Sequence, residues 1–160
     1  MRGWIVAAAL AISALSLSAC GLVAANKETD GIARAVYAEI AQNADLSKDA
    51  RVSPVFISID SQAALAAVRA IVPPTPPTSS AGTGWHFWTS SGVGSSAQTS
   101  YTYKYPGRAI DVVFVMQKGP GQATWTVVGF EAEQEGSTAA PIVVGVPPKS
   151  AAELDSNTSS

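Results

Sequence analysis

Few side chains in this sequence could do chemistry, because it holds one cysteine, Cys20, and one histidine, His86. A zinc site of the usual nitrogen and sulfur type needs more ligands than these two residues supply. His86 stands beside Trp85 and Phe87, where it is most simply a strand residue, and no G-x-S-x-G nucleophile motif is present. We therefore expect no metal and no cofactor.

Asp111 is the acidic residue that stands out, because it lies between Ile110 and Val112 in an apolar run. A carboxylate is costly in such a place unless it is paired or hydrogen-bonded. One interpretation gives it an outward position, paired diagonally with Lys104. The other places it in a pocket beside Gly129, where it acts as a general base or a hydrogen-bond acceptor.

Two further patterns could bind ligands. Residues 92–97 fit the string G-x-G-x-x-[GA], but an alternating segment follows where the dinucleotide motif requires a helix. Tyr101, Tyr103 and Tyr105 could stack on bases or sugars. No cluster of basic residues accompanies them, so the sequence favours core packing for these tyrosines.

Hydrophobic periodicity predicts two helices, which must position these residues. Residues 30–44 carry apolar side chains at helical spacing, with Asp30 as the N-cap. Residues 60–72 form the second helix and end at a proline. The run Val55–Ile59 between them fits either a strand or a helix. Residues 73–84 are rich in Pro, Ser and Gly and predict a loop.

Past residue 84 the pattern changes to alternation, which is typical of strands. Strands are predicted at 85–89, 98–105, 110–117 and 123–133. The composition of residues 136–160 predicts a mostly disordered tail. The sequence therefore predicts an α+β domain over residues 30–135, with two N-terminal helices packed on a three- to four-stranded antiparallel meander.

The turns set the register of the predicted hairpins. A two-residue loop at Pro106-Gly107 pairs Tyr103 with Ile110, and a five-residue second loop pairs Val112 with Val128. One face of the sheet then receives the helices. The opposite face is also apolar, with a small polar row, and carries Val113, Val115, Trp125, Val127, Asp111 and Gly129.

An antiparallel sheet usually leaves one face to water, so a second apolar face needs a cover. The tail segment 142–146, a second subunit or a bound apolar ligand could supply it. We therefore take this second face as the candidate surface for a ligand, a homodimer contact or another envelope protein.

The N-terminal segment has the layout of a secretory signal, with Arg2 before an apolar run over residues 4–17. A membrane-spanning helix needs about 20 apolar residues, so this run is short for a permanent span. The stretch Leu17-Ser18-Ala19-Cys20 resembles the lipobox of bacterial lipoproteins. The resemblance implies cleavage before Cys20 and attachment of lipid to that residue.

The lipoprotein resemblance also implies a location. Gly21 follows Cys20, where Asp would be the familiar inner-membrane retention signal in enteric bacteria. We expect a lipid-anchored protein of the cell envelope, on the outer membrane and facing the periplasm of a Gram-negative bacterium. Residues 1–19 are then a lipoprotein signal peptide, and residues 20–29 are a tether.

The composition excludes electrostatic partners. Without residues 1–19 the chain keeps 141 residues, enough for one domain, with nine Lys and Arg against twelve Asp and Glu. This mild acidity, without a basic cluster, argues against nucleic acid as a partner and against attraction to anionic lipids. The lipid on Cys20 must therefore hold the domain at the membrane.

Two helices come first, followed by a Trp-containing strand, the string Tyr-x-Tyr-x-Tyr-Pro ending at Pro106, and the closing strand Trp125–Phe130. This order resembles that of small bacterial NTF2-like proteins, which have a cystatin-like α+β roll. The resemblance implies a curved sheet wrapped on helices, often with a cone-shaped pocket and a dimer formed through the sheet. Some such proteins are enzymes, but this chain lacks their clear catalytic pair.

Three hypotheses follow from the sequence. The first is a non-enzymatic, lipid-anchored envelope protein whose domain binds a partner protein or a small apolar ligand. The second is an NTF2-like enzyme with Asp111 as general base, and the third is a structural subunit of an envelope complex. Exposure of Asp111 separates the first two, because a general base needs an enclosed site.

Overall fold

The computed structural model describes residues 3–90, 92, 94–150 and 153–154, with side chains from Gly21 onward. Five antiparallel strands form one open sheet in sequence order. The predicted α+β class and antiparallel meander are confirmed, with five strands in place of three to four. The strands are β1 (Ser79–Ser90), β2 (Gly94–Tyr105), β3 (Arg108–Lys118), β4 (Thr126–Gln134) and β5 (Ile142–Gly145).

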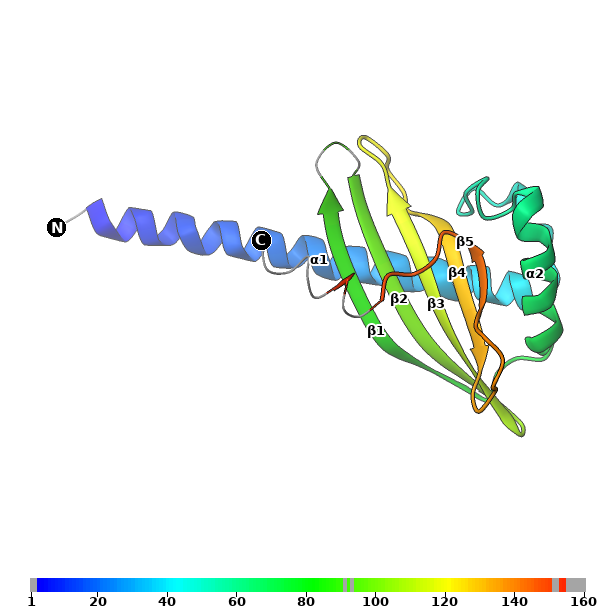
Figure 1. Cartoon of the computed structure of the whole chain (residues 1–160). Coiled ribbons are helices and arrows are strands. Elements are labelled where there is room, and N and C mark those ends of the chain that lie inside the picture. The colour runs from blue at the N-terminus through cyan, green and yellow to red at the C-terminus, as the bar shows by residue number, and fades with distance from the viewer. Residues whose placement is uncertain (1–2, 91, 93, 151–152, 155–160) are drawn as a thin grey trace.

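A long helix, α1 (Gly3–Ala41), crosses one face of the sheet, which we call the inner face (Figure 1). Ala33, Val36 and Ile40 are fully buried on one side of α1, as the helical spacing predicts. The opposite, outer face is crossed by the chain after β5. Among the described residues, no helix combines the length and the apolar composition needed to cross a membrane.

The helix α1 begins well before residue 30, so the prediction of Asp30 as its N-cap is wrong. Residues 21–29, expected as a tether, continue the helix. This stretch contains helix-forming Ala, Leu, Lys and Glu residues and no proline, so nothing in it stops the helix. Thr29 is fully buried and accepts a hydrogen bond from the indole N–H of Trp85. Contact with the sheet therefore begins inside the predicted tether.

The segment between the two long helices contains a short 3-10 helix, η1 (Leu46–Lys48), and then turns across most of Val55–Ile59. That run is thus chiefly neither the strand nor the helix that its composition allowed. The backbone of Arg51 and Ser53 instead brackets Val127 of β4 through two hydrogen bonds of 2.8 and 2.9 Å. The segment is therefore tied to the start of β4.

The second helix, α2 (Ile59–Ile71), is where the sequence predicts it. Leu65 and Val68 are buried on its inward side, and the helix ends before Pro73. It packs beside β5, at the opposite edge of the sheet from β1 (Figure 1). Residues 73–78 lead from it to β1, which starts at Ser79 and takes up the second half of the predicted loop.

The hairpin of β2 and β3 has the predicted register. Tyr103 lies opposite Ile110 across the two-residue loop Pro106-Gly107. Gly107 has a φ of 78°, the left-handed value that a type II turn requires at its third position. With this register, Tyr101, Tyr103 and Tyr105, which stand at alternate positions of β2, all lie on the inner face against α1.

The hairpin of β3 and β4 is displaced by four residues from its predicted register. Val112 lies opposite Ala132 rather than Val128, and Phe114 lies opposite Phe130. The loop is longer than five residues, and a bulge interrupts the pairing at Val115 and Met116. A displacement of four residues leaves Phe130 on the inner face, because side chains alternate with a period of two.

The bulge divides the predicted ligand or partner surface between the two faces. Val127 lies opposite Met116, and both Val127 and Trp125 belong to the core cluster on the inner side. Val113 and Val115 alternate with core residues of β3 and so point to the outer face. The prediction that all four apolar residues share one face is therefore wrong.

The chain beyond residue 135 is more structured than its composition predicts. Val144 of β5 is fully buried, and β5 pairs with β4. Residues 146–150, which we call the tail strap, then cross the outer face (Figure 1). The backbone N–H of Val146 donates to the carbonyl of Val128, while the side-chain amide of Gln98 binds both the N–H and the carbonyl of Lys149. The tail thus covers part of the second apolar face.

Candidate functional site

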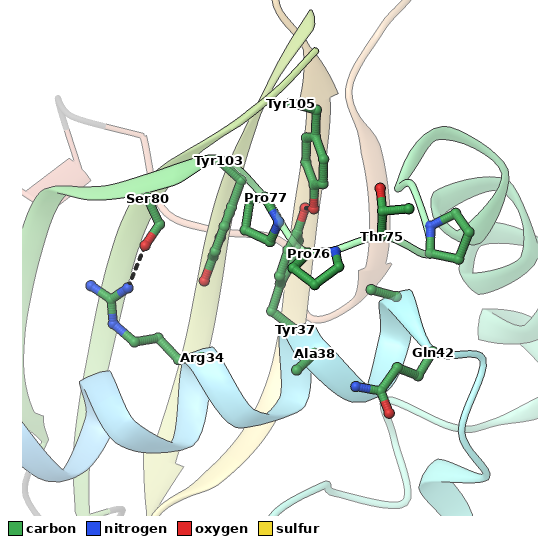
Figure 2. A pocket seen from close by; sticks show the side chains of 12 residues that line it. Arg34, Tyr37, Ala38, Gln42, Thr75, Pro76, Pro77, Ser80, Tyr103 and Tyr105 are labelled. Carbon is green, nitrogen blue, oxygen red and sulfur yellow. Dashed lines mark hydrogen bonds between the residues drawn. The ribbon is translucent and has the colours of Figure 1, made fainter.

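A groove opens between the second half of α1 and the sheet, under the proline-rich connection to β1 (Figure 2). Its volume is about 310 Å³. We call it the tyrosine groove. It is lined by Arg34, Tyr37, Ala38, Ala41, Gln42, Pro74, Thr75, Pro76, Pro77, Ser80, Tyr103 and Tyr105.

Three tyrosines form the wall of the groove. The rings of Tyr37 and Tyr103 are stacked, with centroids 3.7 Å apart and planes 8° from parallel. The hydroxyls of Tyr37 and Tyr105 share a hydrogen bond of 2.8 Å. Because β2 presents alternate residues on one face, Tyr103 and Tyr105 both meet α1, and Tyr37 lies on the buried stripe of that helix.

The hydroxyl of Tyr103 is buried and has no hydrogen-bond partner in the described part of the chain. In Figure 2 it points down toward α1, beside the side chain of Arg34. Burial raises the pKa of Tyr103 to about 12, and it raises the pKa of Tyr37 still further. The phenol of Tyr103 therefore stays protonated and can donate a hydrogen bond. An unmet buried donor costs about 1–3 kcal/mol, which an acceptor from a ligand would recover.

Arg34 closes one end of the groove. Its Nε donates to both carboxylate oxygens of Asp30, and its Nη1 donates to the hydroxyl of Ser80 at 2.8 Å. The guanidinium also lies 4.9 Å from the ring centre of Tyr101, whose hydroxyl donates to Asp30. This network joins α1 to β1 and β2. The network also gives Asp30 a role other than the predicted N-cap: its carboxylate lies within α1 and accepts hydrogen bonds from Arg34 and Tyr101.

Two prolines form the side of the groove away from the sheet. Pro76 and Pro77 lie in front of the tyrosine rings in Figure 2. Proline fixes its own φ and restricts the preceding residue, so this connection is stiff for its length. The tyrosine groove therefore combines rigid apolar walls with a few polar groups, which is typical of small-molecule sites.

Asp111 lies outside this groove. It is exposed on the outer face, opposite Thr102 and Glu133, and its carboxylate accepts a hydrogen bond from the Thr102 hydroxyl. Gly129 lies opposite Val115, so the predicted pocket that joins Asp111 to Gly129 is not formed. An exposed carboxylate lacks the enclosure that the enzymatic hypothesis requires.

Gly129 has a different role from the one that the sequence indicated. A Cβ at this position would overlap the carbonyl oxygen of Val146, so only glycine lets the tail strap pass. Lys149 then places its Nζ 4.9 Å from the ring centre of Trp88. Val115 is buried and Val113 half-buried on this outer face.

The other sequence candidates give no site. His86 is exposed on β1, and the side chain of Cys20 lies outside the described residues. Across the described chain no group of three or more His, Cys, Asp or Glu residues is placed to hold a metal ion.

The tyrosine groove itself was missed by sequence reasoning, which assigned the tyrosines of β2 to core packing. Two signals could have pointed to it: Tyr37 interrupts the aliphatic stripe of α1, and four prolines lie within residues 73–77, just before the sheet. Neither signal shows that the two segments meet.

No family model, no curated protein and no solved structure matches this chain.

Proposed function

We propose that this chain is a non-enzymatic, lipid-anchored protein of the cell envelope whose domain binds a small, largely apolar ligand in the tyrosine groove. The observation that carries the proposal is a groove with rigid aromatic and proline walls, lined by Tyr103, whose buried hydroxyl has no hydrogen-bond partner among the described residues. The ligand has an apolar body that packs on the rings, and one hydrogen-bond acceptor that meets the Tyr103 hydroxyl.

The anchor is supported by the stretch from Leu17 to Cys20, with lipid on Cys20 and the domain on the periplasmic side of the outer membrane. Stable anchoring needs two acyl chains or more, which the lipoprotein resemblance provides. Cys20→Ser should move the protein from the membrane pellet to the soluble fraction. Ala24→Ser, a matched change in the same helix, should stay in the pellet. A Cys20→Ser protein that survives a high-salt wash in the pellet contradicts the anchor.

The finer fold assignment is also a proposal. A long helix that crosses the inner face of an antiparallel meander supports a roll of the NTF2-like or cystatin-like kind. In such a roll the helix and the sheet enclose a pocket between them, and here the tyrosine groove occupies that place.

Native mass spectrometry of the domain, purified from its host and delipidated, tests the ligand. We expect a monomer with a bound small molecule, and Ala38→Trp, which fills the groove from the exposed side of α1, should lose that molecule. Ala24→Trp, on the same helix but away from the groove, should keep it. A ligand-free monomer contradicts the binding proposal, and a stoichiometric dimer or hetero-complex favours a structural subunit.

A second measurement isolates the Tyr103 hydroxyl. Tyr103→Phe keeps the ring and removes the donor, so affinity for the identified ligand should fall about tenfold, the equivalent of one hydrogen bond. Thr126→Val removes a hydroxyl that binds the carbonyl of Gln117, outside the groove. Its affinity should be nearly unchanged. Equal affinity for Tyr103→Phe and the parent would show that the hydroxyl does not meet the ligand.

A further inference from the structure

The helix α1 joins the proposed lipid site directly to the folded domain. It runs without interruption past Cys20 to Ala41. Ala25 is the first described residue that packs on the core, and Thr29 is fully buried. Nine residues of helix span about 13 Å. A lipid on Cys20 therefore holds the domain within about 13 Å of the bilayer surface on a stiff connection.

The edge of the sheet formed by β1 lies on the same side as Cys20. Traced from its N-terminus in Figure 1, α1 passes behind β1 first and reaches the level of α2 last. The hydrogen bond from Trp85 to Thr29 fixes β1 at the point where α1 enters the domain. Because five strands lie in sequence order, β5 is about 19 Å farther away, at four inter-strand spacings.

The chemistry of this end suits a lipid surface. Leu22 and Val23, two and three residues after Cys20, are 43% and 70% exposed. The strand β1 contains no Asp, Glu, Lys or Arg, and Trp85 and Trp88 are half-buried on its two sides. Trp is enriched where a membrane meets water, because its ring is apolar and its N–H is polar.

The tyrosine groove lies farther along the same helix. Its lining on this side runs from Arg34 to Gln42, 14 to 22 residues beyond Cys20, and includes Ser80 at the start of β1. At 1.5 Å per residue, about 21–33 Å separate this lining from the anchor along the helix axis. Trp88, at the other end of β1, lies eight residues from Ser80, or about 26 Å along the strand.

We propose that α1 is a rigid stalk that lays the Trp85–Ser90 end of β1 against the bilayer and holds the tyrosine groove away from it. The proposal rests on the lipid anchor at Cys20. It assigns the bilayer surface as the partner of Leu22, Val23 and this end of β1. It also sets the source of the ligand, which enters the groove from the aqueous side and not from the membrane.

Fluorescence quenching tests the orientation. The lipidated protein is reconstituted into vesicles of phosphatidylethanolamine and phosphatidylglycerol with brominated acyl chains. Variants keep one tryptophan each, at Trp88 or at a new site introduced by Ala67→Trp on the exposed side of α2. Quenching should be much stronger for Trp88 than for position 67. Equal quenching at the two sites overturns the proposal.

A linker variant separates a stalk from a flexible tether. A flexible Gly-Ser segment inserted between Val23 and Ala24 leaves the lipid site and the folded domain intact. Quenching of Trp88 should then fall toward the value for position 67. If the insertion changes nothing, the helix does not set the orientation. If the protein never associates with the vesicles, or lacks the mass of the lipid, the anchor itself fails, and that result is distinct from uniform quenching of an anchored protein.

Discussion

The two faces of the sheet are both apolar, but they are covered in different ways. The inner face is covered by a helix that buries aromatic and aliphatic side chains, and the rings of Phe114 and Phe130 lie 4.7 Å apart under it. The outer face is crossed by the five-residue tail strap, which Gln98 holds through backbone hydrogen bonds. Stability should therefore depend on side-chain volume on the inner face and on backbone clearance on the outer face.

The largest effect should come from Phe114→Ala. The ring is fully buried among aromatic neighbours, so its loss should lower the free energy of unfolding by about 3–5 kcal/mol. Val113→Ala, the next residue on the outer face, should cost about 1 kcal/mol or less. Urea unfolding of the two variants measures the difference. Similar losses would show that the faces are equally packed.

High pH should weaken the inner face next. Burial raises the pKa of Tyr103 to about 12 from about 10 in the unfolded chain. Between these pH values Tyr103 loses its proton in the unfolded state but keeps it in the folded state. The contribution of Tyr103 to the free energy of unfolding is therefore fully present below pH 10 and falls as the pH rises toward 12. A two-unit difference corresponds to about 3 kcal/mol. Urea midpoints across this range should fall less steeply for Tyr103→Phe than for the parent, and parallel curves would contradict the assignment.

On the outer face, Gly129→Ala should displace the tail strap. The new methyl group would overlap the carbonyl of Val146, and relief of such overlap costs about 1–3 kcal/mol. Gly31→Ala, at an open site on α1, should be neutral or stabilising by up to about 1 kcal/mol. Limited proteolysis should cut the tail strap faster in Gly129→Ala alone. An intact tail in that variant would mean that the strap moves without detaching.

The smallest effect should follow from Gln98→Ala, which removes both hydrogen bonds to the backbone of Lys149 at a cost of about 1–2 kcal/mol. Hydrogen exchange at the amide of Lys149 should accelerate, while exchange at the amides of β3 stays slow. Acceleration in both places would show that the strap supports the sheet as a whole. In that case the two faces are not independent.

Local patterns were enough where one turn or one helix face decides the outcome. Pro106-Gly107 specifies a two-residue turn, and the register of Tyr103 with Ile110 follows from it. The apolar stripe ending at Ile40 identified the buried side of α1. The predicted register of the second hairpin is wrong because the loop is longer than five residues and a bulge lies at Val115 and Met116, and a strand pattern specifies neither.

The candidate site could be anticipated only in part. Asp111 drew attention because a carboxylate in an apolar run is unusual, yet its position opposite Thr102 leaves it exposed and hydrogen-bonded. The tyrosines of β2 were recognised as sharing one face. This face meets Tyr37 and the prolines after α2 because of the direction in which α1 crosses the sheet. No local sequence pattern predicts that direction.

The sequence by itself determined the second helix, the buried stripe of the first, the three central strands, the tyrosine face, the first hairpin and the resemblance of the segment ending at Cys20 to a lipobox. Each of these depends on neighbours within a few positions. Only the tertiary structure decided that Gly129 admits the tail strap and that the buried Tyr103 hydroxyl is left without a partner among the described residues. Both features arise where segments far apart in the chain pack against each other, and a local sequence pattern does not specify which segments make that contact.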